Sequence, residues 1–387
     1  MLALALGALA LILAVLLVVV WRGSSLLLVP RPYALMPEFT VLACDAGTVT
    51  LPAPRGRRQF ADTRRRGVYG LLWGDGHGRL GPVVADDGRK VVRPLTVVSG
   101  APPRPGQGAR MDTFVYRRDP LQDLGLAFED VRVDSDVGAL AAWWLPGGRP
   151  GGARTPGGTA VLVVHGRRRG ERAETLRALP AVVAAGRRAL VVAYRNHRGA
   201  PGSPDGFYHY GADEARDVLA GVGYLAARGA RRVALFGFSM GGAAVLEAVK
   251  RWPPDAPELA GLLFDSPLID PAATTLARIR EARMPLPRLW ARASLSVAAW
   301  RSGVRFGALD QRRSAHAVTV PVLLIAGTHD RTVPVATVDA FAARLGGPVR
   351  YRRVPGADHV EAWNRGPEAY EAWVREFLAS LDGADPA

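Results

Sequence analysis

The chain begins with a long apolar run and then changes its pattern of hydrophobic and polar positions twice. Residues 1–21, MLALALGALALILAVLLVVVW, carry no charged side chain, and about 20 apolar residues can cross a bilayer as a helix. From residue 38 to 125, short β-type segments alternate with turns such as Gly74-Asp75-Gly76, which predicts a small β-rich region. The strands predicted there are 39–42, 67–73, 82–84 and 91–98.

The apolar start is compatible with an uncleaved anchor or with a cleaved signal peptide. A signal peptide usually has a basic start, a shorter apolar core and a cleavage site with small residues. This segment has no basic start and ends in Val-Val-Val-Trp-Arg, which favours a transmembrane anchor over residues 1–22. Basic residues follow the segment, with Arg22 and Arg31 nearest, and none precede it. The positive-inside rule therefore mildly favours a cytoplasmic body and leaves the side of the membrane open.

From residue 126 onward, continuous apolar runs alternate with segments of helical periodicity. The run Ala160–Val164 is apolar throughout, as is typical of a strand that is buried on both faces. Residues 213–227 place Val218, Val222 and Leu225 on one helical face. Strands alternating with helices predict right-handed crossovers and a mostly parallel sheet, hence an α/β fold. The predicted strands are 128–133, 140–145, 160–164, 188–194, 233–236, 262–264 and 322–325, and the predicted helices are 171–185, 213–227, 242–250 and 367–381.

These patterns divide the 387 residues into an anchor (1–22), a β-rich region (23–125) and an α/β domain (126–382). Residues 272–315 interrupt the α/β pattern and predict a cap insertion. Within it, one helical face carries apolar side chains, and this face is interpreted either as a lid over an acyl pocket or as a cap packing on its own core. The side chains on that face are Trp290, Ala293, Val297, Trp300 and Val304.

Composition and charge add little to this division. The formal net charge is +15, but nearly all basic residues are Arg scattered among Ala and Gly, and no aromatic-basic motif is present, so no nucleic-acid partner is predicted. Cys44 is the only cysteine, which excludes an intrachain disulfide. No His, Asp or Cys cluster has the spacing of metal ligands, so neither a metal nor another cofactor is predicted.

The chemistry is concentrated in the segment Gly237-Phe238-Ser239-Met240-Gly241, between the predicted strand 233–236 and the predicted helix 242–250. Gly237 and Gly241 allow a strand and a helix to approach closely, while Ser239 takes a strained conformation at the turn. The first amides of the helix then point at the same place as the serine hydroxyl. This pattern resembles the nucleophile elbow of the α/β-hydrolase superfamily, and the resemblance extends over about residues 126–382.

Two further motifs resemble the other members of the family's catalytic triad. Asp330 follows the predicted strand 322–325 within Gly327-x-x-Asp330-x-x-Val-Pro, and His359 lies in Gly356-x-x-His359 shortly before the last predicted helix. The order Ser239, Asp330, His359 is the order that the family uses. A serine needs a histidine to take its proton, and the histidine needs a carboxylate to fix its tautomer. Asp265, after the strand ending at Phe264, is the alternative acid, and Asp358 is expected to be solvated.

The resemblance also implies an oxyanion hole. The amide of Met240 follows the nucleophile, and the amide of Arg167 is assigned as the second donor, with His165 and Gly166 supporting that loop. The resemblance implies a serine hydrolase that cleaves a carboxylic ester or thioester of a small or lipid-like acyl compound through an acyl-enzyme. A serine peptidase and an acyltransferase are alternatives on the same triad, and a non-catalytic ligand-binding protein of this fold is a further one.

Overall fold

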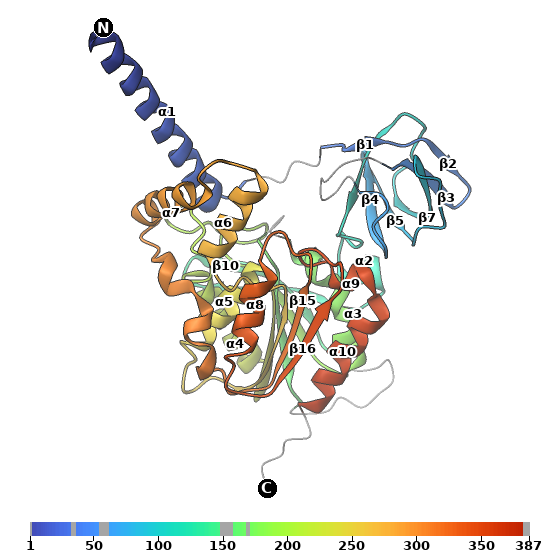
Figure 1. Cartoon of the computed structure of the whole chain (residues 1–387). Helices are drawn as coiled ribbons and strands as arrows, with labels where there is room; N and C mark the ends of the chain where they lie inside the picture. Colours follow the sequence, from blue (N-terminus) through green and yellow to red (C-terminus); the bar gives the residue numbers. More distant parts are fainter. Residues whose placement is uncertain (1, 32–35, 54–61, 148–157, 168–170, 382–387) are drawn as a thin grey trace.

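The computed structural model describes residues 2–31, 36–53, 62–147, 158–167 and 171–381, and the side chains of part of the first helix are not included. The described chain forms a long N-terminal helix, a β-rich unit and a larger α/β unit (Figure 1). The domain end predicted at residue 382 lies outside the described residues.

The α/β unit is built on an eight-stranded sheet in which six neighbouring strands run parallel. Only the pairs β9–β10 and β10–β12 are antiparallel. The predicted alternation of strands and helices therefore produces the mostly parallel sheet that was expected. In order across the sheet the strands are β9 (Glu129–Ser135), β10 (Gly138–Leu145), β12 (Ala189–Val192), β11 (Ala160–Val164), β13 (Arg232–Phe238), β14 (Glu258–Asp265), β15 (Val322–Gly327) and β16 (Val349–Val354).

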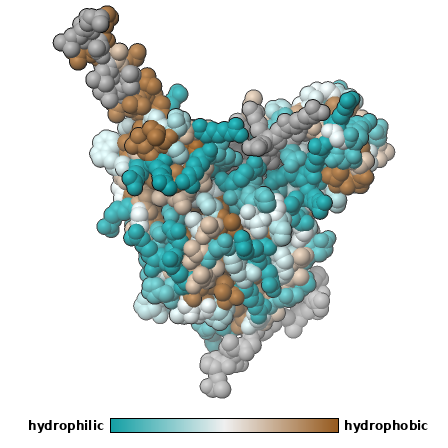
Figure 2. Space-filling view, in the orientation of Figure 1, coloured by the Kyte–Doolittle hydropathy of each residue, from teal (hydrophilic) through white to brown (hydrophobic). Residues whose placement is uncertain are grey.

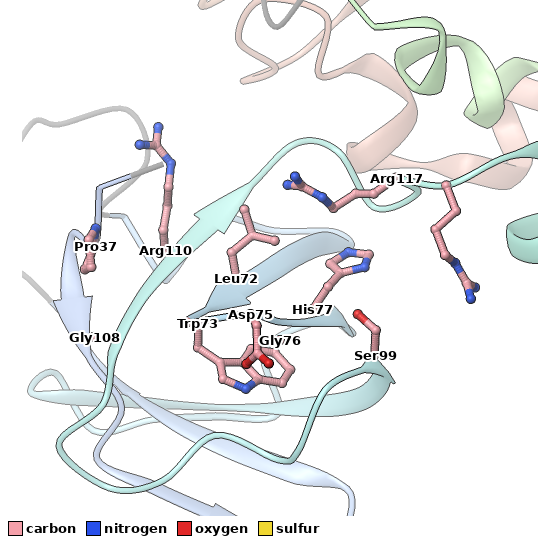
Figure 3. A pocket seen from close by; sticks show the side chains of 12 residues that line it. Pro37, Leu72, Trp73, Asp75, Gly76, His77, Ser99, Gly108, Arg110 and Arg117 are labelled. Carbon is pink, nitrogen blue, oxygen red and sulfur yellow. The ribbon is translucent and has the colours of Figure 1, made fainter. Parts of the chain in front are cut away.

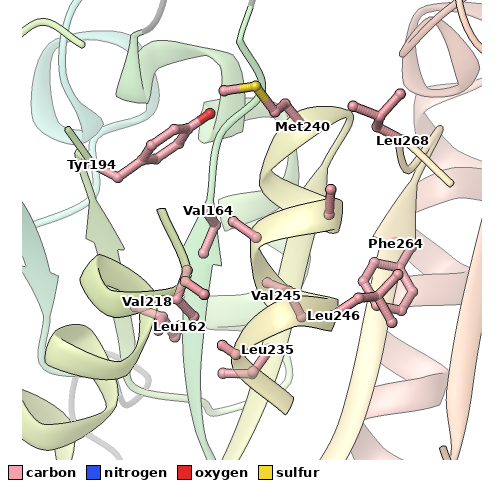
Figure 4. Packing of buried hydrophobic residues seen from close by; sticks show 14 of the residues in the cluster. Leu162, Val164, Tyr194, Val218, Leu235, Met240, Val245, Leu246, Phe264 and Leu268 are labelled. Atoms are coloured by element: carbon pink, nitrogen blue, oxygen red, sulfur yellow. The ribbon is translucent and has the colours of Figure 1, made fainter. Parts of the chain in front are cut away.

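Helices cover both faces of this sheet, which explains why the central strands β11 and β12 are apolar at every position. In β11, Leu162 and Val164 pack into one core cluster and Val161 and Val163 into the other, and all four are fully buried. Figure 4 shows the first cluster, in which side chains of β11 and β13 meet those of α4 and α5. The first face carries α4 (Glu214–Ala227), α5 (Met240–Val249) and α8 (Val335–Ala342). The second face carries α3 (Leu179–Ala184), α9 (Ala362–Arg365) and α10 (Pro367–Ser380), and a 3₁₀ turn (Arg172–Ala178) precedes α3.

The N-terminal β-rich unit has its own antiparallel sheet and its own small core, which includes Tyr69, Leu71 and Trp73. Of the predicted strands, 82–84 does not form, and the short strand β6 follows it instead. A short helix, α2 (Pro120–Leu124), leads from this unit to the α/β unit. The strands are β1 (Phe39–Thr40), β2 (Ala43–Asp45), β3 (Thr48–Pro52), β4 (Tyr69–Trp73), β5 (Gly76–Leu80), β6 (Ala85–Asp86), β7 (Lys90–Ser99) and β8 (Gly108–Asp112).

The first helix, α1 (Leu2–Leu28), continues beyond the predicted anchor and its last turns pack on the α/β unit. Ser24 and Leu28 are buried, and the guanidinium of Arg301 donates hydrogen bonds to the hydroxyls of Ser24 and Ser25. Figure 2 shows apolar residues along the described part of this helix. Among the described residues, none of the helices combines the length and the apolar content needed to cross a membrane. The anchor predicted for residues 1–22 is therefore not supported.

The cap insertion forms α6 (Pro271–Glu281), α7 (Pro287–Ser302) and three 3₁₀ turns (Phe306–Leu309, Gln311–Arg313 and Ala315–Ala317). The prediction that large apolar residues share one helical face of this segment is wrong, because Trp300 is 78% exposed and Val304 lies beyond the end of α7. The buried face carries the small residues Ala291, Ser294 and Ala298. Small residues are needed there because α1 packs against α7: a Cβ added at Gly23 of α1 would lie 2.4 Å from the Ser294 hydroxyl.

Candidate active site

Ser239 lies at the sharp turn between β13 and α5, where the sequence predicts a nucleophile elbow. Its backbone has φ 49° and ψ −118°, a strained conformation for a residue with a side chain. The strand and the helix pass so closely that a Cβ added at Gly237 would lie 2.6 Å from the Cα of Gly242. The surrounding packing thus holds the serine in a conformation that it would not adopt by itself.

Gly241 allows the start of α5 to lie against the end of β11. A Cβ at this position would lie 2.3 Å from the carbonyl oxygen of His165 and 2.5 Å from that of Val164, and neither backbone atom can move alone. We expect Gly241→Ala to destabilise the protein by about 1–3 kcal/mol through overpacking, measured by denaturant unfolding. Gly223→Ala, on an exposed part of α4 with open space around its Cα, is the control and should stabilise by about 1 kcal/mol. Equal unfolding midpoints for the two variants would contradict the role assigned to Gly241.

The three residues that the sequence assigns to a triad are brought together at the carboxyl edge of the sheet. The Ser239 Oγ lies 2.8 Å from the Nε2 of His359, and the His359 Nδ1 lies 2.8 Å from the Oδ2 of Asp330. With the imidazole proton on Nδ1, the ring donates to Asp330 and accepts from the serine hydroxyl. The other oxygen of Asp330 accepts from the amides of Thr332 and Val333, which fixes the carboxylate.

His359 is buried, and its charge is controlled by the carboxylates around it. Burial alone would lower its pKa, but Asp330 and two more distant carboxylates outweigh this effect. The pKa of His359 is therefore raised above its ordinary value of 6.5, so the imidazolium is stabilised relative to a histidine in water. A histidine in this setting can take up a proton from Ser239 at low energetic cost.

The two other carboxylates considered from the sequence have different partners. Asp265 is fully buried and accepts hydrogen bonds from the hydroxyls of Tyr370 and Ser266. Asp358 is also buried, so the expectation that it is solvated is wrong. Its carboxylate accepts hydrogen bonds from the backbone amide and the guanidinium of Arg331 and from the amide of His359. Burial alone would raise the pKa of Asp358, but these hydrogen bonds keep it below the usual range. Asp358 thereby connects the loop that carries Asp330 to the turn that carries His359.

The loop after β11 lies directly against the nucleophile. A Cβ at Gly166 would lie 3.0 Å from the Cβ of Ser239, and the Gly166 amide donates to the buried carboxylate of Glu174. The His165 ring stacks on Tyr194 at 4.5 Å and pairs its Nδ1 with the Gly166 carbonyl at 2.8 Å. Burial lowers the pKa of His165 to about 4, so it is neutral at pH 7. This arrangement suits a structural role better than that of a base.

Arg167 has a function in this loop that the sequence did not indicate. Its guanidinium donates to the carbonyls of Leu26 and Leu27, at the end of α1, and to the hydroxyl of Tyr210. The backbone amide that the sequence assigns to the oxyanion hole therefore belongs to a residue whose side chain holds the last turn of α1. The other assigned donor, the amide of Met240, is the first of the N-terminal amides of α5, which have no partner within the helix.

Glu174 and Glu361 are two buried carboxylates near the site that sequence reasoning missed. Burial raises the pKa of Glu174, an effect that Arg177 and the Gly166 amide oppose. Glu361 is fully buried and accepts from the Asp358 amide at 2.6 Å. Both carboxylates lie in segments that contain several other charged and polar residues, so the sequence gives no sign that either one is buried.

A separate cavity of about 280 Å³ lies in the β-rich unit, between its sheet and the segment that leads to α2 (Figure 3). Trp73 and Leu72 form part of its wall, with His77 and Arg117 beside them. None of the triad residues lines it. Within the described residues, no group of three or more His, Cys, Asp or Glu side chains could hold a metal ion.

Comparison with known proteins shows the family of this chain. The sequence profile of the prolyl oligopeptidase family matches residues 180–383, which is more than half of the chain. The chain belongs to the prolyl oligopeptidase family. This match includes Ser239, Asp330 and His359, whereas a domain of unknown function matches residues 40–112, within the β-rich unit.

Relatives of this prolyl oligopeptidase family member are found among sequences and solved structures. Two uncharacterised proteins of Mycobacterium tuberculosis, from two strains, are each 30% identical over 242 residues, which cover 60% of this chain and 73% of theirs. An esterase of Pyrococcus furiosus, Pf2001, superposes with a TM-score of 0.52 at 22% identity, over 69% of this chain and 95% of its own. The structural likeness confirms the α/β-hydrolase fold that the sequence predicts, and the family match shows a hydrolase.

Proposed function

We propose that the protein is a serine hydrolase that cleaves a carboxylic ester or thioester by acyl-enzyme chemistry. The observation that carries this proposal is the chain of two 2.8 Å contacts from the Ser239 hydroxyl through His359 to Asp330. A hydroxyl, an imidazole and a carboxylate in this order are the parts that nucleophilic acyl transfer needs.

In the proposed mechanism the Ser239 Oγ attacks the acyl carbonyl while its proton passes to the Nε2 of His359. Asp330 accepts from Nδ1 and stabilises the imidazolium. The amides of Met240 and Arg167 are proposed to donate to the oxyanion, and losing one such donor costs about 3 kcal/mol of barrier. His359 then gives its proton to the leaving alcohol or thiol, and a water molecule activated by the same imidazole releases the acid.

A serine peptidase is the second candidate, and the family match favours it. Ester or thioester cleavage is placed first because an alcohol or a thiol leaves more readily than an amine, so the three residues suffice without further groups to bind a peptide. An acyltransferase would use the same acyl-enzyme with an acceptor other than water. A protein that only binds a ligand would have no use for the complete arrangement.

Two measurements separate these candidates. Covalent labelling of the intact chain by a fluorophosphonate probe is expected for any of the enzymes and not for a ligand-binding protein. A panel of p-nitrophenyl esters from acetate to palmitate, beside a dipeptide p-nitroanilide, then gives the preferred bond and chain length. Hydrolysis of the anilide with a larger kcat/KM than that of every ester would replace the esterase proposal by the peptidase. Added alcohols or amines that appear in the products would indicate acyl transfer.

Contact of residues 1–21 with a membrane, and the cytoplasmic side that Arg22 and Arg31 favour, remain predictions of the sequence. Flotation of the full chain with lipid vesicles measures the first of them. The oligomeric state is left open.

A further inference from the structure

The turn that carries His359 is held by side chains of the β-rich unit. Glu361, two residues after the histidine, is fully buried, and its carboxylate accepts from the guanidinium of Arg65 at 2.5 Å and from the hydroxyl of Tyr69. The same carboxylate accepts from the amide of Asp358 at 2.6 Å. Glu361 thus links the N-terminal unit to the residue directly before the histidine, and the Arg65 guanidinium also lies 3.7 Å from the carboxylate of Asp358 itself.

This turn needs support because its backbone is strained. Val360 has φ 51°, in the left-handed region that a β-branched side chain rarely adopts. Its amide donates to the Ser266 hydroxyl at 3.0 Å, and its carbonyl accepts from Arg177 at 2.8 Å. Such a conformation persists only where the surrounding structure imposes it, and Glu361 connects these surroundings to the β-rich unit.

The β-rich unit also forms hydrogen bonds with the segment that follows the turn. The amide of Val68 donates to the carbonyl of Asn364 at 2.9 Å, and the Asn364 side chain donates to the carbonyls of Val68 and Thr113. A Cβ at Gly67 would lie 2.0 Å from the Asn364 carbonyl oxygen, so the two segments are in close contact. The β-rich unit therefore contacts the turn that carries the His359 imidazole through backbone groups and polar side chains.

We propose that Arg65 and Tyr69 are positioning residues for the hydrolase reaction: they neutralise and orient Glu361, which holds the His359 turn in register with Ser239 and Asp330. A buried carboxylate is costly without a cationic or hydrogen-bonding partner. If these partners are removed, the buried carboxylate of Glu361 loses the groups that orient it, and the strained turn can relax. A displacement of about 1 Å at a catalytic group can lower a rate about 100-fold. This inference rests on the proposed function.

The test compares two adjacent arginines. Arg65→Ala removes a partner of Glu361, whereas Arg64→Ala makes the same change of charge at a residue that pairs with Asp86 and the Gly88 carbonyl inside the β-rich unit. We expect kcat for the best p-nitrophenyl ester to fall about 10- to 100-fold in Arg65→Ala with KM within twofold, and to stay unchanged in Arg64→Ala. Arg65→Lys should restore part of the rate. Equal kcat in the two alanine variants would overturn the inference.

Two further measurements keep the inference distinct from a general loss of folding or of function. Tyr69→Phe removes only a hydroxyl, and it should lower kcat and weaken the downfield proton NMR signal of the His359 Nδ1–H, while thermal unfolding shows a folded protein. An unchanged NMR signal in both Tyr69→Phe and Arg65→Ala would overturn the positioning role. If the intact chain fails to react with fluorophosphonate although the signal responds to both substitutions, the proposed function fails and the structural link to the histidine stands.

Discussion

Replacing Ser239 with alanine is expected to lower kcat for the best ester by about a million-fold, with little change in KM. The reason is that Ser239 supplies the hydroxyl that lies 2.8 Å from the His359 Nε2, and in the proposed mechanism no acyl-enzyme forms without it. In serine hydrolases the loss of the nucleophile removes nearly all of the triad's contribution, and a residual of about 10³–10⁴ over water remains from binding and the oxyanion hole. Steady-state kinetics on the ester panel measures this loss.

Fluorophosphonate labelling should disappear in the same variant. Ser380→Ala is the matched control, because this serine lies on the exposed face of α10 and donates to the Phe377 carbonyl within its own helix. Its kinetics and labelling should equal those of the unmodified protein. Ester hydrolysis that survives in Ser239→Ala at more than about one hundredth of the original rate would be incompatible with the proposed mechanism.

The sheet could be predicted because its central strands are covered on both faces. Strands such as Ala160–Val164 read as continuous apolar runs for that reason. The last strand, β16, was missed because it lies at the edge of the sheet, where Arg350, Arg352 and Arg353 are exposed. Charged side chains on an edge strand oppose pairing with other chains, and they also remove the apolar pattern by which a strand is found.

The approach of Ser239, Asp330 and His359 could be predicted because Ser239 and Asp330 follow apolar strands in recognisable turns and His359 lies in a Gly-x-x-His motif before the last helix. What surrounds the triad could not, because it depends on contacts between distant segments. Arg65 meets Glu361 across 296 positions of the sequence, and Arg167 meets Leu27 across 140. The hydrophobic periodicity of the sequence does not indicate pairs of residues that are so far apart along the chain. The face of α7 was misread for a related reason: its partner is α1, and this contact selects small residues where the pattern of large apolar residues pointed elsewhere.

Asp330→Asn is the second large effect, with an expected loss of about 10⁴-fold in kcat. The amide is isosteric with the carboxylate but can donate to the His359 Nδ1, which places the imidazole proton on Nε2, where it cannot accept from Ser239. Asp265→Asn is the control, since the carboxylate of Asp265 accepts from the hydroxyls of Tyr370 and Ser266. The His359 Nδ1 lies 2.8 Å from the carboxylate of Asp330 instead. We expect Asp265→Asn to reduce stability and to change kcat less than about tenfold, and the reverse ranking of the two variants would identify Asp265 as the acid.

The pH profile gives an independent check on the same carboxylate. Hydrolysis needs the neutral imidazole, so kcat/KM should rise with pH as His359 loses its proton and fall as pH decreases. Because the pKa of His359 is raised above 6.5, the midpoint of this rise is expected above pH 6.5 in the unmodified protein. Asp330 is the main cause that raises this pKa against the effect of burial. In Asp330→Asn the remaining activity should therefore persist to lower pH, and a midpoint that does not move would mean that Asp330 does not control the charge of the histidine.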